Sequence, residues 1–262
     1  MKNIVFIVTS FIFLSILIFF IYIDLEHNFY KKPPSVSKTE LYMDDEEGKE
    51  KDFQLENKGW STDMFVPIVN RNPYNNELQN YVGSQVTMDG NKIKFTAEKV
   101  HDEYISGKVE SDIAFRYGTF SFKVNKIKEH GLFPAIWLLP TNHTFNDEVD
   151  IYEAIGRDPD FFYGVHHWGQ NQQRSRDYFK YFYSEDTSKV ITFEWTKEKM
   201  EWFYDGNSIY RIENNIPEVP MYMIMNLAVG GDWAQAPDQT TKFPAEFEVE
   251  IIEFSPKEVV RR

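Results

Sequence analysis

Short alternating or apolar runs separated by turn signals recur along the chain from about Trp60 onward. Residues 118–124 alternate between apolar and polar side chains, residues 190–195 and 200–204 are joined by a polar turn, and residues 221–229 are apolar except for one asparagine. Period two is typical of a strand with one buried face, and an unbroken apolar run is typical of a strand covered on both faces. No long window has a helical period with caps at both ends. The sequence therefore predicts an all-β domain in which two antiparallel sheets pack face to face.

The amino-terminal segment has a different character. Residues 4–23 are nearly all apolar, and twenty helical residues span about 30 Å, the thickness of a bilayer's hydrocarbon core. A cleaved signal peptide usually has a shorter apolar region and small residues at the cut, which the following Asp24-Leu-Glu-His27 does not offer. We therefore expect a signal anchor, a transmembrane helix over residues 1–25, then an acidic flexible linker over residues 26–52 and a folded domain over residues 53–262.

Composition excludes several classes of partner and cofactor. The 262 residues carry a net charge of −13, which argues against a nucleic-acid partner and weighs against a heavily sulfated polysaccharide. Cysteine is absent, so neither a disulfide nor a thiolate metal site is available. Aromatic residues make up 17% of the chain, and such an excess suits a surface on which aromatic rings stack on sugar faces as well as a core.

The stretch Glu148-Val-Asp-Ile-Tyr-Glu153 holds three carboxylates within six residues of a predicted strand. Alternation puts Glu148 and Asp150 on one face, and a β-bulge near residues 151–152 would bring Glu153 to the same face. Two carboxylates converging on one site are what acid-assisted cleavage of a glycoside requires. The alternative is an edge strand with a solvated acidic face, which the clustering of like charges disfavours.

Several sequence blocks lie in a fixed order around these acids. They are residues 75–79 (NNELQ), 131–140 (GLFPAIWLLP), 163–169 (YGVHHWG) and 226–233 (NLAVGGDW). Together with the acidic stretch, this set resembles family 16 of the glycoside hydrolases, the laminarinase-like β-glucanases, over about residues 60–255. The resemblance implies a β-jelly-roll sandwich with a concave substrate cleft and a retaining mechanism. It assigns Glu148 as nucleophile, Glu153 as acid/base and Asp150 as their helper.

The resemblance and strand alternation together point to residues that bind substrate. Alternation turns Trp137 toward the cleft while residues 136 and 138 face the core, and a core-facing Leu78 leaves Asn75, Glu77 and Gln79 toward the cleft. The family resemblance adds three further positions: His167, Trp168 and Trp233. Five of these residues also have a plainer interpretation: core packing for Trp137, a solvated edge for Asn75 and Glu77, a buried hydrogen-bonded ring for His167, and a stabilised turn for Trp233.

No metal or cofactor is expected to be required. His166 and His167 are adjacent on a strand, so they point to opposite faces and do not share one ion. Some relatives carry a structural calcium ion held partly by an aspartate of the last strand. The matching position here is Glu250, which puts that ion in doubt.

We therefore expect a retaining, endo-acting hydrolase of a β-linked polysaccharide, with β-1,3- or β-1,3-1,4-glucan favoured. A membrane-anchored transglycosylase, or a trimming hydrolase that remodels a cell-wall or exported polymer such as a galactan, uses the same residues. A noncatalytic carbohydrate-binding protein is the weakest of the three, because such a protein does not need all three acids. The catalytic domain is expected to be a monomer outside the cytoplasm, anchored in the membrane, or secreted if the amino-terminal segment is cleaved.

Overall fold

The chain divides into two units, residues 1–50 and 51–262. The computed structural model describes residues 62–71, 74–142, 147–170, 173–182 and 190–262, all of which belong to the second unit. The predicted anchor and linker lie outside the described residues. Within the described ranges, no helix has the length and the apolar character needed to cross a membrane.

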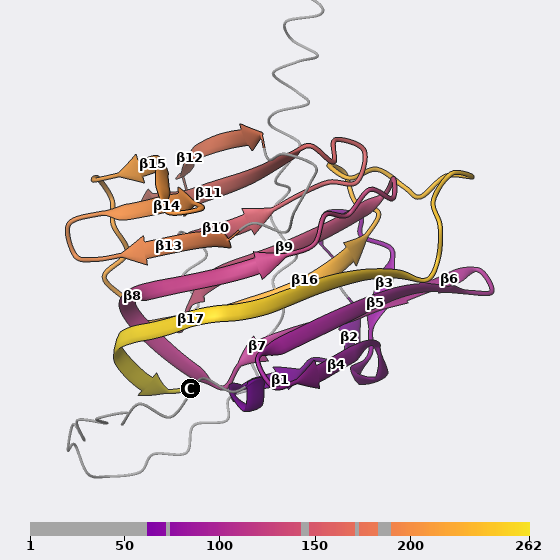
Figure 1. Cartoon of the computed structure of the whole chain (residues 1–262), viewed down its shortest axis with the longest axis horizontal. Coiled ribbons are helices and arrows are strands. Elements are labelled where there is room, and N and C mark those ends of the chain that lie inside the picture. The colour runs from indigo at the N-terminus through magenta and orange to yellow at the C-terminus, as the bar shows by residue number, and fades with distance from the viewer. Residues whose placement is uncertain (1–61, 72–73, 143–146, 171–172, 183–189) are drawn as a thin grey trace, which may run out of the picture. The chain divides into compact units, whose positions relative to one another are not determined.

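One sheet of the second unit, which we call the acid-bearing sheet, contains the acidic stretch (Figure 1). Its strands are antiparallel to their neighbours and run in the order β1 (Phe65–Pro67), β7 (Lys108–Ser111), β16 (Met221–Val229), β9 (Leu132–Pro140), β10 (Glu148–Glu153), β11 (Phe161–Gln170) and β12 (Gln173–Phe182). The acidic strand β10 is therefore an inner strand, with backbone partners on both sides. This rules out the solvated edge strand as the explanation of the acids.

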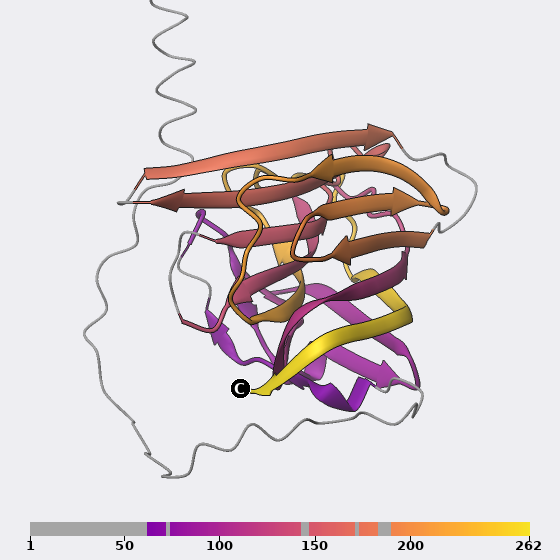
Figure 2. The ribbon, with the colours of Figure 1, turned by 90° about the vertical axis from the view of Figure 1, so that its left-hand side faces the viewer.

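A second sheet, the covering sheet, packs against the first. Its order is β4 (Val86–Asp89), β5 (Lys92–Val100), β17 (Ala245–Arg261), β8 (Ile113–Val124), β13 (Val190–Trp195), β14 (Met200–Tyr204) and β15 (Asn207–Ile212). The short strands β2 (Asn70–Arg71), β3 (Gln79–Tyr81) and β6 (Glu103–Ser106) attach to the end of β5. In Figure 1, β16 passes behind β17, and Figure 2 turns the same layers by 90°.

Aromatic side chains from both sheets fill the core. Tyr152 of β10 stacks on Phe247 of β17, with ring centroids 5.9 Å apart and an interplanar angle of 7°. Tyr152 also stacks on Phe162 of β11 at 5.8 Å. Trp202 of β14 donates its indole N–H to the backbone carbonyl of Ile151 at 3.2 Å. These contacts fix the core face of β10 and thereby its opposite face, where the acids lie.

The two-sheet prediction is confirmed in detail. The runs at 190–195, 200–204 and 221–229 are strands with those bounds, and all nine residues of β16 are buried. Asp205 and Gly206 connect β14 to β15 with φ values of 49° and 76°. A two-residue turn with φ positive at both positions matches the twist of a hairpin.

The segment at residues 75–79 differs from the expectation of a period-two strand with a core-facing Leu78. Asn75 and Asn76 both have φ of 55°, in the left-handed region, so the chain turns there instead of extending. Leu78 is 41% exposed, whereas Gln79 is fully buried. Asparagine tolerates left-handed conformations better than most residues, which explains the turn.

Candidate active site

The acidic strand β10 contains the β-bulge that its carboxylate spacing predicts. Asp150 pairs with Val165 and Glu153 with Tyr163, so three steps along β10 match two along β11. The register of β10 against β9 shifts at the same place, between Asp150 and Tyr152. The extra residue turns Ile151 and Tyr152 both toward the core, where each is fully buried. The bulge therefore puts all three acids on the face of the acid-bearing sheet that points away from the core, the acid face.

Two adjacent histidines on β11 point to opposite faces, as predicted. His167 pairs with Glu148 across the strands and shares the acid face, whereas His166 pairs with Val149 and faces the core. His167 Nε2 lies 3.6 Å from Asp150 Oδ2 and 3.8 Å from Glu148 Oε1. His167 thus stands between two of the acids and is the buried neighbour of both.

An arginine that the sequence did not single out completes the cluster. Arg174 of β12 reaches over β11 and places Nη2 2.8 Å from Glu148 Oε2. In the register, Arg174 stands opposite Gly169, which has no side chain to block that path. The guanidinium lies at hydrogen-bonding distance and so orients the Glu148 carboxylate.

The local environment raises the pKa values of the other two acids, Glu153 and Asp150. Burial raises the pKa of Glu153 to about 8, the negative charge of Glu148 adds to the rise, and Arg176 and Arg174 oppose it. Burial also raises the pKa of Asp150 well above its ordinary value, with Glu153 and Glu148 adding to the effect. With a pKa of about 8, Glu153 holds a proton at neutral pH, which is the state a general acid needs.

His167 is held in the neutral form. Burial, together with the charges of Arg174 and Arg176, lowers the pKa of His167 to about 2. Both carboxyl groups face the same ring nitrogen, Nε2, so the ring lies between Glu148 and Asp150 without adding a charge.

Trp137 lies on the acid face, as expected, and a hydrogen-bond chain fixes its ring. It stands opposite Asp150 on β9, while its neighbours Ile136 and Leu138 are fully buried in the core. Its indole N–H donates to Asn226 Oδ1 at 2.8 Å, and Asn226 Nδ2 donates to the Tyr81 hydroxyl at 3.1 Å. Asn226 is the single polar residue of β16, and that exception in an apolar run was an available signal for the site.

Glu77 reaches the same network from the turn at residues 75–77. It makes an isolated bridge to Gly230 and accepts a hydrogen bond from Gln79 Nε2 at 2.7 Å. Burial raises the pKa values of Tyr81 and Glu153, and the negative charge of Glu77 adds to both rises. Asn75 is exposed, and its backbone carbonyl accepts from the amide of Asp232 at 2.8 Å. Glu77 is therefore brought to the acids, whereas Asn75 holds the neighbouring loop by its backbone.

Trp233 lies on that loop, beside the Glu153 end of the acidic strand. Its ring packs edge-on against Tyr163 at 4.9 Å and against Phe133 at 5.3 Å. Tyr163 is the cross-strand partner of Glu153. Trp233 is partly exposed, so it has a face available to solvent next to the site.

Trp168 differs from the expectation that it binds substrate with its neighbours. It follows His167 on a regular strand and so points to the opposite face, where its indole N–H donates to Asp177 Oδ2 at 3.2 Å. The alternation that separated the two histidines applies equally to Trp168, and it would have excluded this residue from the acid face.

Glu148, Asp150 and His167 each offer one potential ligand atom, and these atoms lie within 4.8 Å of one another. A cation there would compete with the Arg174 guanidinium for Glu148. We interpret the cluster as a proton-sharing set. At the predicted calcium position, Glu250 faces the Lys92 ammonium at 3.8 Å, a positive charge that disfavours an ion at this carboxylate.

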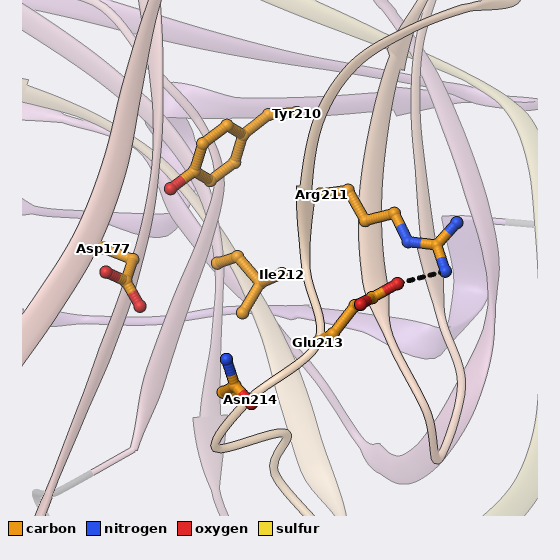
Figure 3. A pocket seen from close by; sticks show the side chains of 6 residues that line it. All are labelled: Asp177, Tyr210, Arg211, Ile212, Glu213 and Asn214. Atoms are coloured by element: carbon orange, nitrogen blue, oxygen red, sulfur yellow. Dashed lines mark ion pairs between the residues drawn. The ribbon is translucent and has the colours of Figure 1, made fainter.

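A cavity of about 490 Å³ lies away from the acids, between the edge strands β12 and β15 (Figure 3). It is lined by Asp177, Tyr210, Arg211, Ile212, Glu213 and Asn214. Asp177 is the cross-strand partner of the core-facing His166, so it lies on the opposite face of β12 from the acid face. The cavity is therefore distinct from the cluster around Glu148.

Comparison with known proteins agrees with this arrangement. Residues 74–244 match the family described as "Glycosyl hydrolases family 16". The chain is 28% identical over 220 residues to glucan endo-1,3-beta-glucosidase A1 of Niallia circulans, covering 68% of this chain and 32% of that protein. It is 31% identical over 177 residues to a beta-glucanase of Rhodothermus marinus, covering 57% of this chain and 62% of that protein.

The fold also matches solved structures. The laminarinase catalytic domain from Thermotoga maritima MSB8 superposes with a TM-score of 0.65 at 21% identity, covering 75% of this chain and 94% of that domain. The two-sheet arrangement is therefore a jelly-roll-like fold. The chain belongs to family 16 of the glycosyl hydrolases.

Proposed function

We propose that the protein is a retaining, endo-acting glycoside hydrolase that cleaves a β-linked glucan, with β-1,3- or β-1,3-1,4-linkages as the favoured targets. The observation that carries this proposal is the bulged strand β10, which turns Glu148 and Glu153 to one face and gives them different electrostatic environments. A general acid must hold a proton, which the raised pKa of Glu153 favours, and the Arg174 guanidinium lies at hydrogen-bonding distance from the carboxylate that we assign as nucleophile. The names of the glucanase relatives support the substrate class.

In the first step Glu148 attacks the anomeric carbon while Glu153 gives its proton to the leaving oxygen, and a glycosyl ester on Glu148 forms. In the second step Glu153, now ionised, takes a proton from water as that water attacks the same carbon and releases Glu148. His167 lies 3.8 Å from Glu148 Oε1 and helps to position the nucleophile, and Asp150, 3.6 Å from the same His167 nitrogen, helps to hold the ring in place. Trp137 and Trp233 offer ring faces to sugars on the two sides of the acids.

The test is a pair of amide variants with a matched control. Glu148→Gln and Glu153→Gln should each lower kcat by roughly 10²–10⁴-fold on a β-1,3-glucan, because each removes one acid of a two-carboxylate mechanism. Glu246→Gln, on the outside of the covering sheet where Glu246 pairs with Lys94, should retain full activity.

Azide should restore turnover of an activated glycoside by Glu148→Ala and give a glycosyl azide of inverted configuration. Wild-type turnover by Glu148→Gln would rule out the assignment.

We further propose that residues 1–25 anchor the enzyme in a membrane with its catalytic domain outside the cytoplasm. The support is the apolar run from residue 4 to residue 23 and the acidic linker that follows it. A protein that starts at Phe53 should remain soluble and active, whereas the full chain should sediment with membranes. Full-length protein found in the soluble fraction with an intact amino terminus would contradict the anchor.

A further inference from the structure

The cavity of about 490 Å³ between the edge strands β12 and β15, which we call the edge cavity, has no part in the proposed cleavage. Its volume lies in the range of about 300–1,000 Å³ that is typical of ligand sites. Figure 3 shows Asp177, Tyr210 and Asn214 around the side chain of Ile212. Ile212 is buried and belongs to the core, so the edge cavity combines an apolar surface with several polar groups.

Asp177 retains hydrogen-bonding capacity toward the edge cavity. Its Oδ2 accepts the indole N–H of Trp168 at 3.2 Å. Among the described residues, no protein group donates to Asp177 Oδ1. A carboxylate has about four acceptor sites, so most of this capacity is unused. Burial raises the pKa of Tyr210 and the negative charge of Asp177 adds to the rise, so the tyrosine hydroxyl stays protonated.

A buried histidine stands beside Asp177. His166 is its cross-strand partner, and directly opposed side chains on one face of a sheet have Cβ atoms about 4.5–5.5 Å apart. His166 is fully buried, and within the described part of the chain neither of its ring nitrogens makes a hydrogen bond. Burial lowers the pKa of His166 to about 4, so the neutral ring has one N–H donor and one acceptor nitrogen. Buried polar groups nearly always have partners, so the Asp177 side of the edge cavity offers more donors and acceptors than the protein itself satisfies.

The charges of the edge cavity exclude several classes of ligand. The Arg211 guanidinium is paired with Glu213 and lies 3.9 Å from Glu201, so it is not available to an anion. With Glu213 paired, Asp177 is the one lining carboxylate left, whereas a calcium ion takes about six to eight oxygen ligands. An apolar molecule would remove Asp177 and Asn214 from water without giving them partners. A neutral ligand with several hydroxyl groups is left.

A sugar unit meets these requirements. Its hydroxyl groups donate to Asp177 and accept from the Asn214 amide, while its C–H groups contact the apolar Ile212. The edge cavity is also close to the acids along the chain. Arg174, which contacts Glu148, and Asp177 are three residues apart on β12, about 10 Å, and point to opposite faces.

We infer that the edge cavity is a second, noncatalytic site that binds a neutral sugar unit of the polysaccharide on which the acids act. A polymer that passes around the edge strand β12 contacts both sites at once, which raises its effective concentration at the acids. A chain of a few sugars occupies one site at a time and gains nothing from the other. The inference rests on the proposed function for the identity of the polymer.

Two indole N–H groups report on the two sites separately. Trp168 donates to Asp177 at the edge cavity, and Trp137 donates to Asn226 on the acid face. The full chain, with Glu148→Gln to prevent turnover, is titrated with a β-1,3-glucan tetrasaccharide while the ¹H–¹⁵N signals of the indoles are followed. Substitution of each tryptophan by phenylalanine identifies its signal. Both signals should shift, each with its own saturation curve.

Further variants connect the Trp168 shift to the edge cavity. Asn214→Ala and Asp177→Asn should each raise the tetrasaccharide concentration at half the Trp168 shift about threefold or more, because each weakens hydrogen bonds to the sugar. The Trp137 curve should stay unchanged. Asp177→Asn keeps an oxygen for the Trp168 indole and so preserves that contact. Ser175→Ala is the matched control, since Ser175 is exposed on the same face of β12 and does not line the edge cavity. On insoluble β-1,3-glucan, Asn214→Ala should also lower the rate relative to its rate on the tetrasaccharide.

A Trp168 signal that stays fixed while the Trp137 signal shifts would overturn the inference and leave the proposed function intact. A Trp168 curve that is unaltered in both Asn214→Ala and Asp177→Asn would do the same. Glucose and glycerol at the same concentration are the probes for a free sugar and for any polyol, and an equal Trp168 shift with either would contradict the assignment to a polymer. No response of Trp137, together with no hydrolysis of β-1,3-glucan by the wild type, would instead overturn the proposed function.

Discussion

Arg174 Nη2 lies 2.8 Å from Glu148 Oε2, although β11 separates the strands that carry them. The contact is made across Gly169, the cross-strand partner of Arg174. The proposed nucleophile thus depends on a residue that no sequence motif marks, and the following change tests this dependence.

Arg174→Gln should lower kcat by roughly 10- to 100-fold, because a hydrogen bond to a charged group contributes about 1.5–3 kcal/mol. The fold should persist, since the Arg174 side chain is partly exposed and belongs to an edge strand. Arg174→Lys keeps the charge and should recover part of the loss. Unchanged kcat in Arg174→Gln would show that the contact has no part in catalysis.

The pH dependence of the wild-type enzyme should reflect Glu153. The acid must be protonated in the first step, so kcat/KM should fall as the pH rises through about 8. Arg176 lowers the pKa of Glu153, so Arg176→Gln should move this limb to higher pH. Rate profiles on a neutral glucan check both points, and a limb that stays fixed in the variant would contradict the electrostatic assignment.

Glu153 should also make stability depend on pH. Its pKa in the folded state, about 8, is raised above the ordinary value of 4.5. The stability contributed by the protonated carboxyl is therefore fully present below pH 4.5 and is lost as the pH rises through about 8. Glu153→Gln has no such proton to lose, so the amount by which its Tm exceeds that of the wild type should grow between about pH 4.5 and pH 8 and level off at higher pH. Parallel Tm curves for the two proteins would be inconsistent with a raised pKa.

The acidic strand could be predicted from the sequence because its chemistry restricts its geometry. Three carboxylates spaced as Glu148, Asp150 and Glu153 share a face only if one residue is inserted, and the structure has that bulge. Alternation likewise placed Trp137 on one face and separated His166 from His167. Side chains alternate between the two faces of a strand, so the face of each residue can be predicted wherever the strand has no bulge or turn.

Other residues could not be predicted because they depend on pairing between distant segments. Arg174 and Arg176 join the site only through the register of β12 on β11, which no local pattern in residues 173–182 specifies. The prediction for residues 75–79 was wrong for a different reason. Asn75 and Asn76 are two consecutive left-handed residues, so the segment is not a regular strand, and the alternation expected of a strand wrongly placed Leu78 in the core.

Gly164→Ala should destabilise the domain by about 1–3 kcal/mol, as expected for overpacking of a well-filled core. A Cβ at this position would lie 2.3 Å from Cε1 and 2.7 Å from Cζ of Phe179, a ring that packs against Trp202 at 5.6 Å. Gly83→Ala is the matched control, because a Cβ there would meet only Pro67 Cβ at an ordinary 3.7 Å. Chemical denaturation of both variants measures the difference, and equal midpoints would show that the core around Phe179 adapts.

The contribution of Trp233 should depend on the length of the substrate. If its exposed face is a stacking platform, Trp233→Ala should weaken transition-state stabilisation by about 1–3 kcal/mol on long oligosaccharides and less on short ones, since a short chain leaves that position empty. Thermal stability should fall only modestly, because the residue lies on a loop and packs edge-on against Phe133 and Tyr163. Trp168→Ala provides the comparison, since Trp168 faces away from the acids and should cause no loss that depends on chain length. Values of kcat/KM over a series of oligosaccharides would decide the question. An equal loss at every length, or unfolding of Trp233→Ala, would mean that Trp233 only supports the loop.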